Sequence, residues 1–268
     1  MIDPRVIGVK QAQLEYGQEL HAMDAGLTDR EREILGTLLE TGVMCRDAAR
    51  TFGMLSRVEK MPELSYNLPR LETCPGAFDY NSSGTAAMLC QVCEKCYGGK
   101  GHYRMAHVKA KTQERMKDWP KPGWVHKMTI ALMARRWHRW HDVGDICCPE
   151  YALKLTTVCK QTPLTQHWIP TKSWRVDWAL PYLEALQAMD NVVVRYSGTT
   201  FVKGRVKEFG PDVIGSVVLK SRQPTTFDLL AEQRGEYLIC PAHRQNGKCG
   251  PCRACWCDEY RMIAYPFH

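Results

Sequence analysis

Two groups of cysteines constrain this chain more than any other feature of its sequence. The 268 residues include 13 cysteines, and most of these fall into two groups of the same form. Each group has one cysteine and, further along, three cysteines at the spacing C-x2-C-x2-C: Cys74 with Cys90, Cys93 and Cys96, and Cys240 with Cys249, Cys252 and Cys255. Single cysteines are often small core residues, which suits Cys45 and Cys159. Two regular runs in one chain instead indicate metal binding.

The spacing within each run bears on which metal is bound. Three thiolates two residues apart can bind one face of a cubane iron–sulfur cluster, and the more distant cysteine can bind its fourth iron. A tetrahedral zinc site more often uses two separated C-x2-C pairs. We therefore predict two 4Fe-4S clusters and keep zinc as the alternative at each group. Cys257 closely follows the second run, so the spare cysteine of that group stays open.

The remaining composition indicates the compartment. Hydrophobic residues make up 44% of the chain and charged residues 24%, as in an ordinary soluble protein. No stretch approaches the ~20 apolar residues of a membrane span, and the N-terminus has no secretory signal. We expect a cytoplasmic protein without a membrane partner, in a compartment where disulfides are rare. The net charge of +7 is consistent with an anionic partner, including nucleic acid.

The first 60 or so residues have the pattern of a helical segment. Thr28 or Asp29 stands where a helix cap is expected, with acidic residues in the following turn. A second helix is predicted from Arg46 to Phe52, ending near Gly53. The pair resembles a helix-turn-helix of the LuxR type, but residues 59–69 supply no further helix. We prefer a plain helical hairpin that packs on the main domain.

From about residue 64 the sequence alternates between predicted strands and helices. We expect helices at 149–161 and 180–189, and strands at 136–142, 165–171, 192–196 and 216–220. This order implies βαβ units and a parallel sheet, as a full or partial (β/α) barrel in an α/β fold. We divide the chain into an N-terminal helical segment (1–60), a barrel core (61–235) and a C-terminal cysteine-rich region (236–268). Chemistry in such folds gathers at the carboxyl ends of the strands.

Several segments resemble a phage family named after gene product eighty-eight. The early ones are Cys74-Pro75-Gly76-Ala77 and Cys93-x2-Cys96-Tyr97, the latter followed by the glycine-rich residues 98–103. The later ones are Trp140 to Asp145, Thr171 to Arg175, and the cysteine-rich ending from Cys240 to Trp256. The resemblance covers about residues 64–257 and leaves the N-terminal helices unexplained. It implies a phage protein that acts in the host cytoplasm.

That family is similar in pattern to radical S-adenosylmethionine (SAM) enzymes, and the similarity implies an activity. In those enzymes a cysteine triplet after the first barrel strand holds a cluster whose open iron binds SAM, and reduction yields a 5′-deoxyadenosyl radical. Carried over, Cys90, Cys93 and Cys96 would hold the SAM cluster, and the second group would hold an auxiliary cluster. The SAM-binding positions would be Tyr97, Gly144, Asp145 and Ser197.

The first group departs from the radical SAM pattern in its spacing. Those enzymes commonly have C-x3-C-x2-C, whereas this chain has C-x2-C-x2-C. Cys74 could act as a fourth ligand and exclude SAM, or form a triplet with Cys93 and Cys96. A closed cluster would serve electron transfer or structure rather than radical chemistry.

Other residues are candidates for binding a substrate. His138 lies in the aromatic and basic run 137–141, where alternate residues of a strand could line a cavity. Lys172 and Arg175 follow a predicted strand end and could hold an anionic substrate or the SAM carboxylate. His243 lies between ligands of the second group and could replace one cysteine. The segment from Gly198 to Gly210 could form a mobile loop over the site.

Three hypotheses of function follow. The first is a radical SAM-like enzyme that modifies a nucleotide, a nucleic-acid base or a small metabolite, with a reductase, flavodoxin or ferredoxin as electron donor. The second is a zinc-binding protein that binds nucleic acid, with an affinity that falls steeply with salt. The third is an electron-transfer protein in which both iron–sulfur clusters are closed.

Overall fold

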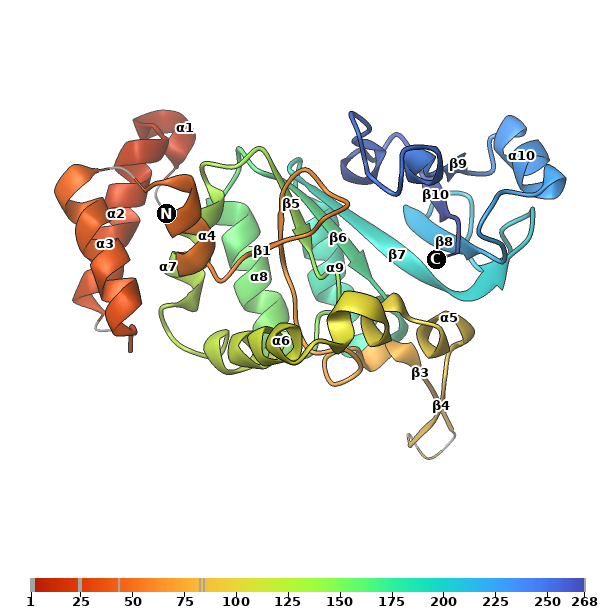
Figure 1. Cartoon of the computed structure of the whole chain (residues 1–268), viewed down its shortest axis with the longest axis horizontal. Helices are drawn as coiled ribbons and strands as arrows, with labels where there is room; N and C mark the ends of the chain where they lie inside the picture. Colours follow the sequence, from red (N-terminus) through yellow and green to blue (C-terminus); the bar gives the residue numbers. More distant parts are fainter. Residues whose placement is uncertain (1–2, 24–25, 43, 82, 84, 268) are drawn as a thin grey trace.

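The computed structural model describes residues 3–23, 26–42, 44–81, 83 and 85–267. The molecule is elongated, with the N-terminal helices at one end, the sheet in the middle and the C-terminal strands at the other end (Figure 1). None of its described helices is both long and apolar enough to cross a membrane.

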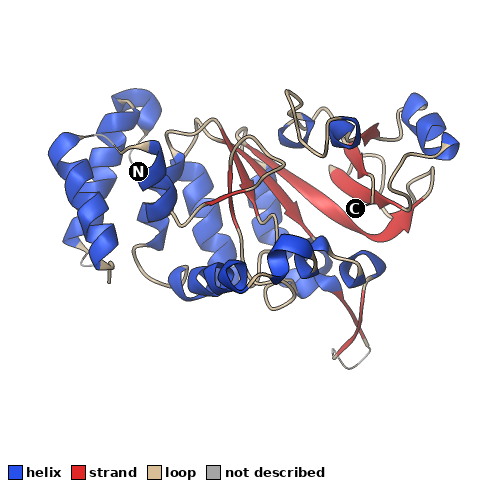
Figure 2. Ribbon diagram, in the orientation of Figure 1, coloured by secondary structure: helices blue, strands red, loops and turns tan. Residues whose placement is uncertain are grey.

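A mostly parallel sheet organises the described part of the chain (Figure 2). Its strand order is β1-β2-β5-β6-β7-β8-β10-β9, and all neighbours except β1 and β2 run parallel. The strands are β1 (Ser56–Arg57), β2 (Leu64–Tyr66), β5 (Trp137–Trp140), β6 (Gln166–Thr171), β7 (Val192–Val202), β8 (Gly215–Leu219), β9 (Leu238–Ile239) and β10 (Met262–Tyr265). From β2 to β8, strands that are consecutive in this series are also neighbours in space. The α/β class with a mostly parallel sheet is thus confirmed, while a closed or partial barrel stays a prediction.

The two faces of the sheet have different cover. Helices α7 (Trp124–Leu132), α8 (Pro149–Gln161) and α9 (Leu180–Gln187) build the main core with one face, where Trp140 and Ile169 are fully buried. Trp168, next to Ile169, instead packs with Met61 and Trp256 on the opposite face. Neighbouring strand residues point to opposite faces, so the C-terminal cysteine-rich segment covers the face that these helices leave free.

The N-terminal helices are fixed to this body. They are α1 (Pro4–Ile7), α2 (Val9–Ala22), α3 (Asp29–Thr41) and α4 (Arg46–Phe52), and their apolar cluster includes Ile130 and Met133 from the region of α7. Thr28 caps α3 in a reciprocal capping box with Glu31, which confirms the predicted start of this helix. The observed packing on α7 is that of a helical hairpin docked on the main domain.

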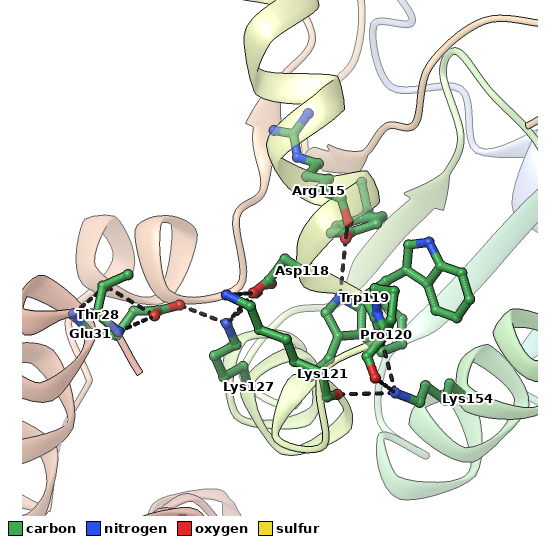
Figure 3. A network of polar contacts seen from close by, with 11 residues as sticks. Thr28, Glu31, Arg115, Asp118, Trp119, Pro120, Lys121, Lys127 and Lys154 are labelled. Carbon is green, nitrogen blue, oxygen red and sulfur yellow. Dashed lines mark hydrogen bonds and ion pairs between the residues drawn. The ribbon is translucent and has the colours of Figure 1, made fainter. Parts of the chain in front are cut away.

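A buried polar network strengthens this attachment (Figure 3). The Lys127 ammonium group donates to Glu31 at 2.6 Å and to Asp118, at the end of α6 (Ala106–Asp118), at 2.8 Å. Burial opposes ionisation of Glu31, but Lys127 and Thr28 outweigh it and lower its pKa. Lys154 in turn donates to the backbone carbonyls of the turn after α6.

The predicted elements can now be compared with the structure. The helices at 46–52 and 149–161 are found at those residues, and the other predicted strands and helices are found within a few residues of their expected ends, except that the strand predicted at 192–196 continues to Val202. The predicted loop from Gly198 is wrong at its start, because 198–202 continue β7, and Phe201 and Val202 pair with β8 after an irregularity that follows Ser197. The C-terminal region is also more than an extension, since β9 and β10 complete the main sheet.

Candidate metal centres

The first cysteine group lies in the connection after β2, the first strand of the parallel series. Cys74 precedes the short turn η1 (Pro75–Ala77), Cys90 is the N-cap residue of α5 (Gln91–Glu94), and Cys96 follows that helix. The Cys90 amide donates to the Ala77 carbonyl at 2.9 Å, which brings the two parts of the group together. Between them, β3 (Phe78–Tyr80) and β4 (Ala86–Leu89) form a hairpin that projects from the body (Figure 1).

The thiols of the first group interact electrostatically. A hydrogen bond between the thiols of Cys90 and Cys93 lowers the pKa of Cys90 and raises that of Cys93. Burial raises the pKa of Cys74 to about 12, and the charges of Asp145 and Cys96 act in the same direction. Cys93 is also affected by Cys96. Cys74, Cys90 and Cys93 also pack in one small apolar cluster, with Cys96 close enough to influence Cys74 and Cys93.

Two neighbouring strand ends supply the polar surroundings of this group. The Asp145 carboxylate, after β5, accepts from the Thr171 hydroxyl at 2.6 Å and from the Lys172 amide at 2.7 Å. Burial raises the pKa of Asp145 in spite of these bonds. The Lys172 ammonium group favours the thiolate form of Cys74, Cys90 and Cys93. Lys172 is therefore a cation that acts on three thiols of the first group, and Arg175 acts in the same direction on Cys90.

Gly76 and Arg175 hold the cysteine connection against the end of β6. A Cβ atom on Gly76 would lie 1.8 Å from the Lys172 carbonyl oxygen, so no side chain fits there. Arg175 donates to the carbonyls of Gly76 at 2.9 Å and Phe78 at 3.1 Å, and pairs with Asp79. Its guanidinium thus binds the connection itself, a role that differs from the predicted binding of a substrate anion.

The second group lies over the face of the sheet opposite the main helices. The turn η7 (Ala254–Trp256) contacts β6 and β7, and the Cys249 amide donates to the Lys60 carbonyl at 2.8 Å. Burial raises the pKa of Cys240, Cys249 and Cys255, that of Cys255 to about 12. Each of these thiols is also influenced by another thiol of the group, and Cys252 acts on both Cys240 and Cys249. Cys249 and Cys255 pack against the same apolar cluster, that of Met61, Trp168 and Trp256.

A buried arginine supports the second group. Arg195, in β7, is fully buried, and its guanidinium donates to six backbone carbonyls: those of Ala254, Cys255, Cys257, Gly215, Tyr260 and Arg261. In the described part of the chain it forms no ion pair with a carboxylate. Its charge therefore suits a nearby set of thiolates. Sequence reasoning missed this residue, although an arginine within the β-branched run 192–196 was a signal.

Arg139 lies between the two groups. It pairs with Asp142 at 2.5 Å, donates to the Tyr97 hydroxyl at 3.1 Å, and lies 4.4 Å from the centre of the Trp168 ring. Its guanidinium acts to lower the pKa of the Cys249 and Cys255 thiols, against the larger effect of burial, which raises both. The Tyr97 hydroxyl also donates to the Asp142 carbonyl. Tyr97 follows Cys96 directly, and Arg139 acts on two thiols of the second group. The hydrogen bond from Arg139 to Tyr97 therefore connects the two groups.

Other predicted residues lie near the first group or apart from it. Gly144 has a φ of 86° and approaches Leu68 so closely that a Cβ atom would lie 2.7 Å away, which explains the glycine. The Ser197 carbonyl accepts from Trp174 at 3.2 Å, beside the end of β6. His138 is not brought to either group: its buried ring contacts Trp140 and His167 on the helix-covered face.

The remaining cysteines have separate positions. Cys159 is fully buried in the main core, as predicted. Cys45 is exposed and caps α4, with its sulfur accepting from the Ala48 amide at 3.3 Å, so the prediction of a core residue is wrong there. Cys147 and Cys148 lie just before α8, with their sulfurs 4.0 Å apart.

Two further observations bear on metal binding. Across the residues that the structure describes, no three Cys, His, Asp or Glu side chains lie close enough together to hold a single metal ion. His243 has both ring nitrogens engaged, Nδ1 with the Cys240 carbonyl at 2.7 Å and Nε2 with the Arg244 Nε at 3.1 Å. This arrangement leaves His243 no free nitrogen with which to replace a cysteine ligand. The iron–sulfur clusters themselves stay a prediction.

Comparison with known families places the chain. A family model described as Gene product 88 matches residues 43–258. The chain belongs to this family. The match confirms the resemblance seen in the sequence and begins earlier than expected, so α4 lies within it while α1 to α3 lie outside. No curated protein and no solved structure matches the chain. None of these comparisons supports the further similarity of Gene product 88 to radical SAM enzymes.

Proposed function

We propose that this Gene product 88 protein is an iron–sulfur enzyme of the radical SAM type, with its SAM-binding cluster at the first cysteine group. One arrangement carries the proposal: three successive parallel strands, β2, β5 and β6, are followed by the cysteines, by Asp145 and by Lys172. Carboxyl ends of neighbouring parallel strands meet at one edge of a sheet, where active sites of such folds form.

The residues of the first group suit a cluster in their chemistry. Thiolates are the usual ligands of iron–sulfur clusters, and Cys90 and Cys93 are buried. Cys90, Cys93 and Cys96 would hold the cluster, while Lys172 would balance its negative charge and orient a carboxylate. The cofactor pair held there would supply radical chemistry that removes a hydrogen atom from a substrate.

The second group would hold an auxiliary cluster. Cys240, Cys249, Cys252 and Cys255 offer four thiolates, and Arg195 and Arg139 supply positive charge from the sheet. Such outer contacts stabilise charged metal centres and orient their ligands. An electron donor such as a flavodoxin, a ferredoxin or a reductase would be the partner.

The test is metal content together with SAM cleavage. Protein purified without oxygen should contain about eight irons and eight sulfides per chain, its electron paramagnetic resonance spectrum should change on addition of SAM, and dithionite should start SAM cleavage. Cys93→Ala should abolish cleavage, whereas Cys45→Ser, a change at an exposed cysteine outside both groups, should not. Colourless protein with two zincs, or equal cleavage by wild type and Cys93→Ala, would refute the proposal.

A closed cluster for electron transfer is the second candidate. The observation that favours it is Cys74, whose thiol is within electrostatic reach of Cys96 and beside Asp145. As a fourth ligand it would leave no iron open for SAM. The protein would then be coloured and redox-active, and SAM would not change its spectrum.

Cys74→Ala separates these two candidates. If Cys74 is not a ligand, the variant retains the wild-type spectrum and the wild-type response to SAM. If Cys74 closes the cluster, the wild type does not respond to SAM and the variant loses iron or gains an open site.

A further inference from the structure

A cavity of about 710 Å³ lies beside the second cysteine group. Its wall includes Trp137 and Gln166, the paired first residues of β5 and β6, together with the turns that carry Cys252 and Cys257. Asp145 and Lys172 follow the other ends of the same two strands. The cavity is therefore a separate place from the SAM site proposed above, and what we infer from it does not rest on that proposal.

The cavity offers positive charge held in position. Arg244 and Arg253 line it, and Glu232 is the only acidic side chain among its described lining residues. The Arg244 Nε donates to the His243 Nε2, and the His243 Nδ1 donates to the Cys240 carbonyl, so a chain of two hydrogen bonds orients this guanidinium. Its two terminal nitrogens have no partner among the described residues and can donate hydrogen bonds to an anion.

The second guanidinium belongs to the same wall. Arg253 donates through one terminal nitrogen to the carbonyls of Gly250 at 2.8 Å and Cys252 at 2.7 Å. The Cζ carbon of its guanidinium lies 5.8 Å from the centre of the Trp137 ring. Arg253 is thus fixed over an aromatic surface of the cavity. Glu232 adds one negative charge to the wall, with Oε1 accepting from the Ile239 amide at 2.7 Å, so the two guanidinium groups leave the wall with a net positive charge.

Aromatic rings make up another part of the wall. Trp137 is partly exposed and rests edge-on against the buried Trp256, with ring centres 5.8 Å apart. The Trp256 indole nitrogen donates to the His138 carbonyl at 2.9 Å, which fixes the ring behind Trp137. Tyr260, also in the wall, is 45% exposed. Aromatic rings beside guanidinium groups are the combination that recognises a flat base joined to a phosphate.

We propose that this cavity binds a single nucleotide, with the base against the aromatic side chains Trp137 and Tyr260 and the phosphate at Arg244 and Arg253. The volume lies within the range of sites that enclose one small ligand. This volume suits one nucleotide better than a strand of several. The bound phosphate would also lie near Cys252 and Cys257, so the nucleotide would contact the segment that carries the second cysteine group.

Isothermal titration of the intact protein, purified without oxygen, tests the proposal. The probes are ribonucleoside 5′-monophosphates, the corresponding nucleosides, ribose 5-phosphate and a short single-stranded oligonucleotide. At least one monophosphate should bind saturably, with an affinity about tenfold higher than its nucleoside, because a charge-assisted hydrogen bond is lost with the phosphate. Ribose 5-phosphate should bind weakly because it lacks the base.

Two variants locate the site. Arg244→Met should weaken monophosphate binding about tenfold and leave nucleoside binding unchanged, whereas Tyr260→Ser should weaken both. Arg261→Met, at an exposed arginine outside the cavity, is the matched control and should bind like the wild type. Both Arg244 and Tyr260 are exposed, so these variants should fold, and circular dichroism checks this.

Several outcomes would overturn the proposal. They are the absence of saturable binding by every monophosphate, equal affinity for nucleotide and nucleoside, and unchanged affinity in Arg244→Met. Binding of the oligonucleotide without binding of any monophosphate would equally refute a single-nucleotide site. Since SAM and reductant are absent from the titration, failure here leaves the SAM-cleavage test unaffected, and the reverse also holds.

Discussion

The two cysteine groups have the same spacing but are supported in different ways. The first group is held by backbone contact, with Gly76 against the Lys172 carbonyl and Arg175 bonded to the connection after β2. The second group is held by one buried side chain, Arg195, whose guanidinium donates hydrogen bonds to six backbone carbonyls. The C-x2-C-x2-C run thus supplies the thiols. The surrounding fold determines how rigidly these thiols are held and which charged side chains surround them.

Their electrostatic surroundings differ as well. The first group lies at strand ends, where Lys172 favours the thiolates and Asp145 opposes them. The second lies on a face of the sheet between Arg139 and Arg195, with Asp142 paired to Arg139. We therefore expect single substitutions to damage one metal centre and spare the other.

The largest effect is expected from Arg195→Met. This change removes a buried donor from six carbonyls, of which those of Ala254 and Arg261 keep a backbone amide partner, and it should lower the free energy of unfolding by about 3–5 kcal/mol. Urea unfolding and iron analysis measure the result, which should be loss of the second cluster with the first retained. Arg261→Met is the control and should leave both quantities unchanged, while Arg195→Lys should recover part of the loss. Full metal content in Arg195→Met would contradict the role of this residue.

Gly76→Ala should damage the first group instead. The added Cβ atom would meet the Lys172 carbonyl at 1.8 Å, so the connection must move, at a cost of about 1–3 kcal/mol. We expect loss of iron from the first group alone. Spectroscopy measures this loss, and urea unfolding measured in parallel gives the change in stability. Gly210→Ala, at a glycine with open space around it, should have no effect. Equal loss from both groups would show that the two are not held independently.

Lys172→Met should weaken metal binding at the first group without unfolding the chain. Removal of this ammonium group raises the pKa of the surrounding thiols, and metal ions bind thiolates in competition with protons. Affinity in a chelator competition should fall about tenfold, and metal loss on acidification should begin at a higher pH than in the wild type. Lys10→Met, at an exposed lysine in the N-terminal helix α2, far from Lys172 in the sequence, should match the wild type. An unchanged pH profile in Lys172→Met would disprove the assignment.

The smallest effect is expected from Tyr265→Phe. The Tyr265 hydroxyl lies 3.3 Å from the Cys255 sulfur, and its removal takes away one hydrogen bond from the second group. The expected change is about 1 kcal/mol, seen as faster metal release from the second group. The first group serves as the internal control, and its release rate should stay constant.

Much of the local structure could be predicted from the sequence. Pro149 stands in the first turn of α8, Thr28 and Glu31 form a capping box, and these signals placed helix starts correctly. The alternation of strands and helices predicted the parallel sheet. Predictions failed where a residue's environment came from distant parts of the chain: β7 extends to Val202 because β8 pairs with Phe201 and Val202.

By itself, the sequence determined the candidate thiol ligands, their grouping in two runs and the α/β class, because these depend on residue type and short-range spacing. Only the tertiary structure decided which charged side chains serve those donors. It placed His138 on the helix-covered face, turned Arg175 to the cysteine connection and buried Arg195 beneath the second group. The physical reason is that a strand's alternation tells which residues share a face, whereas long-range packing decides what covers each face.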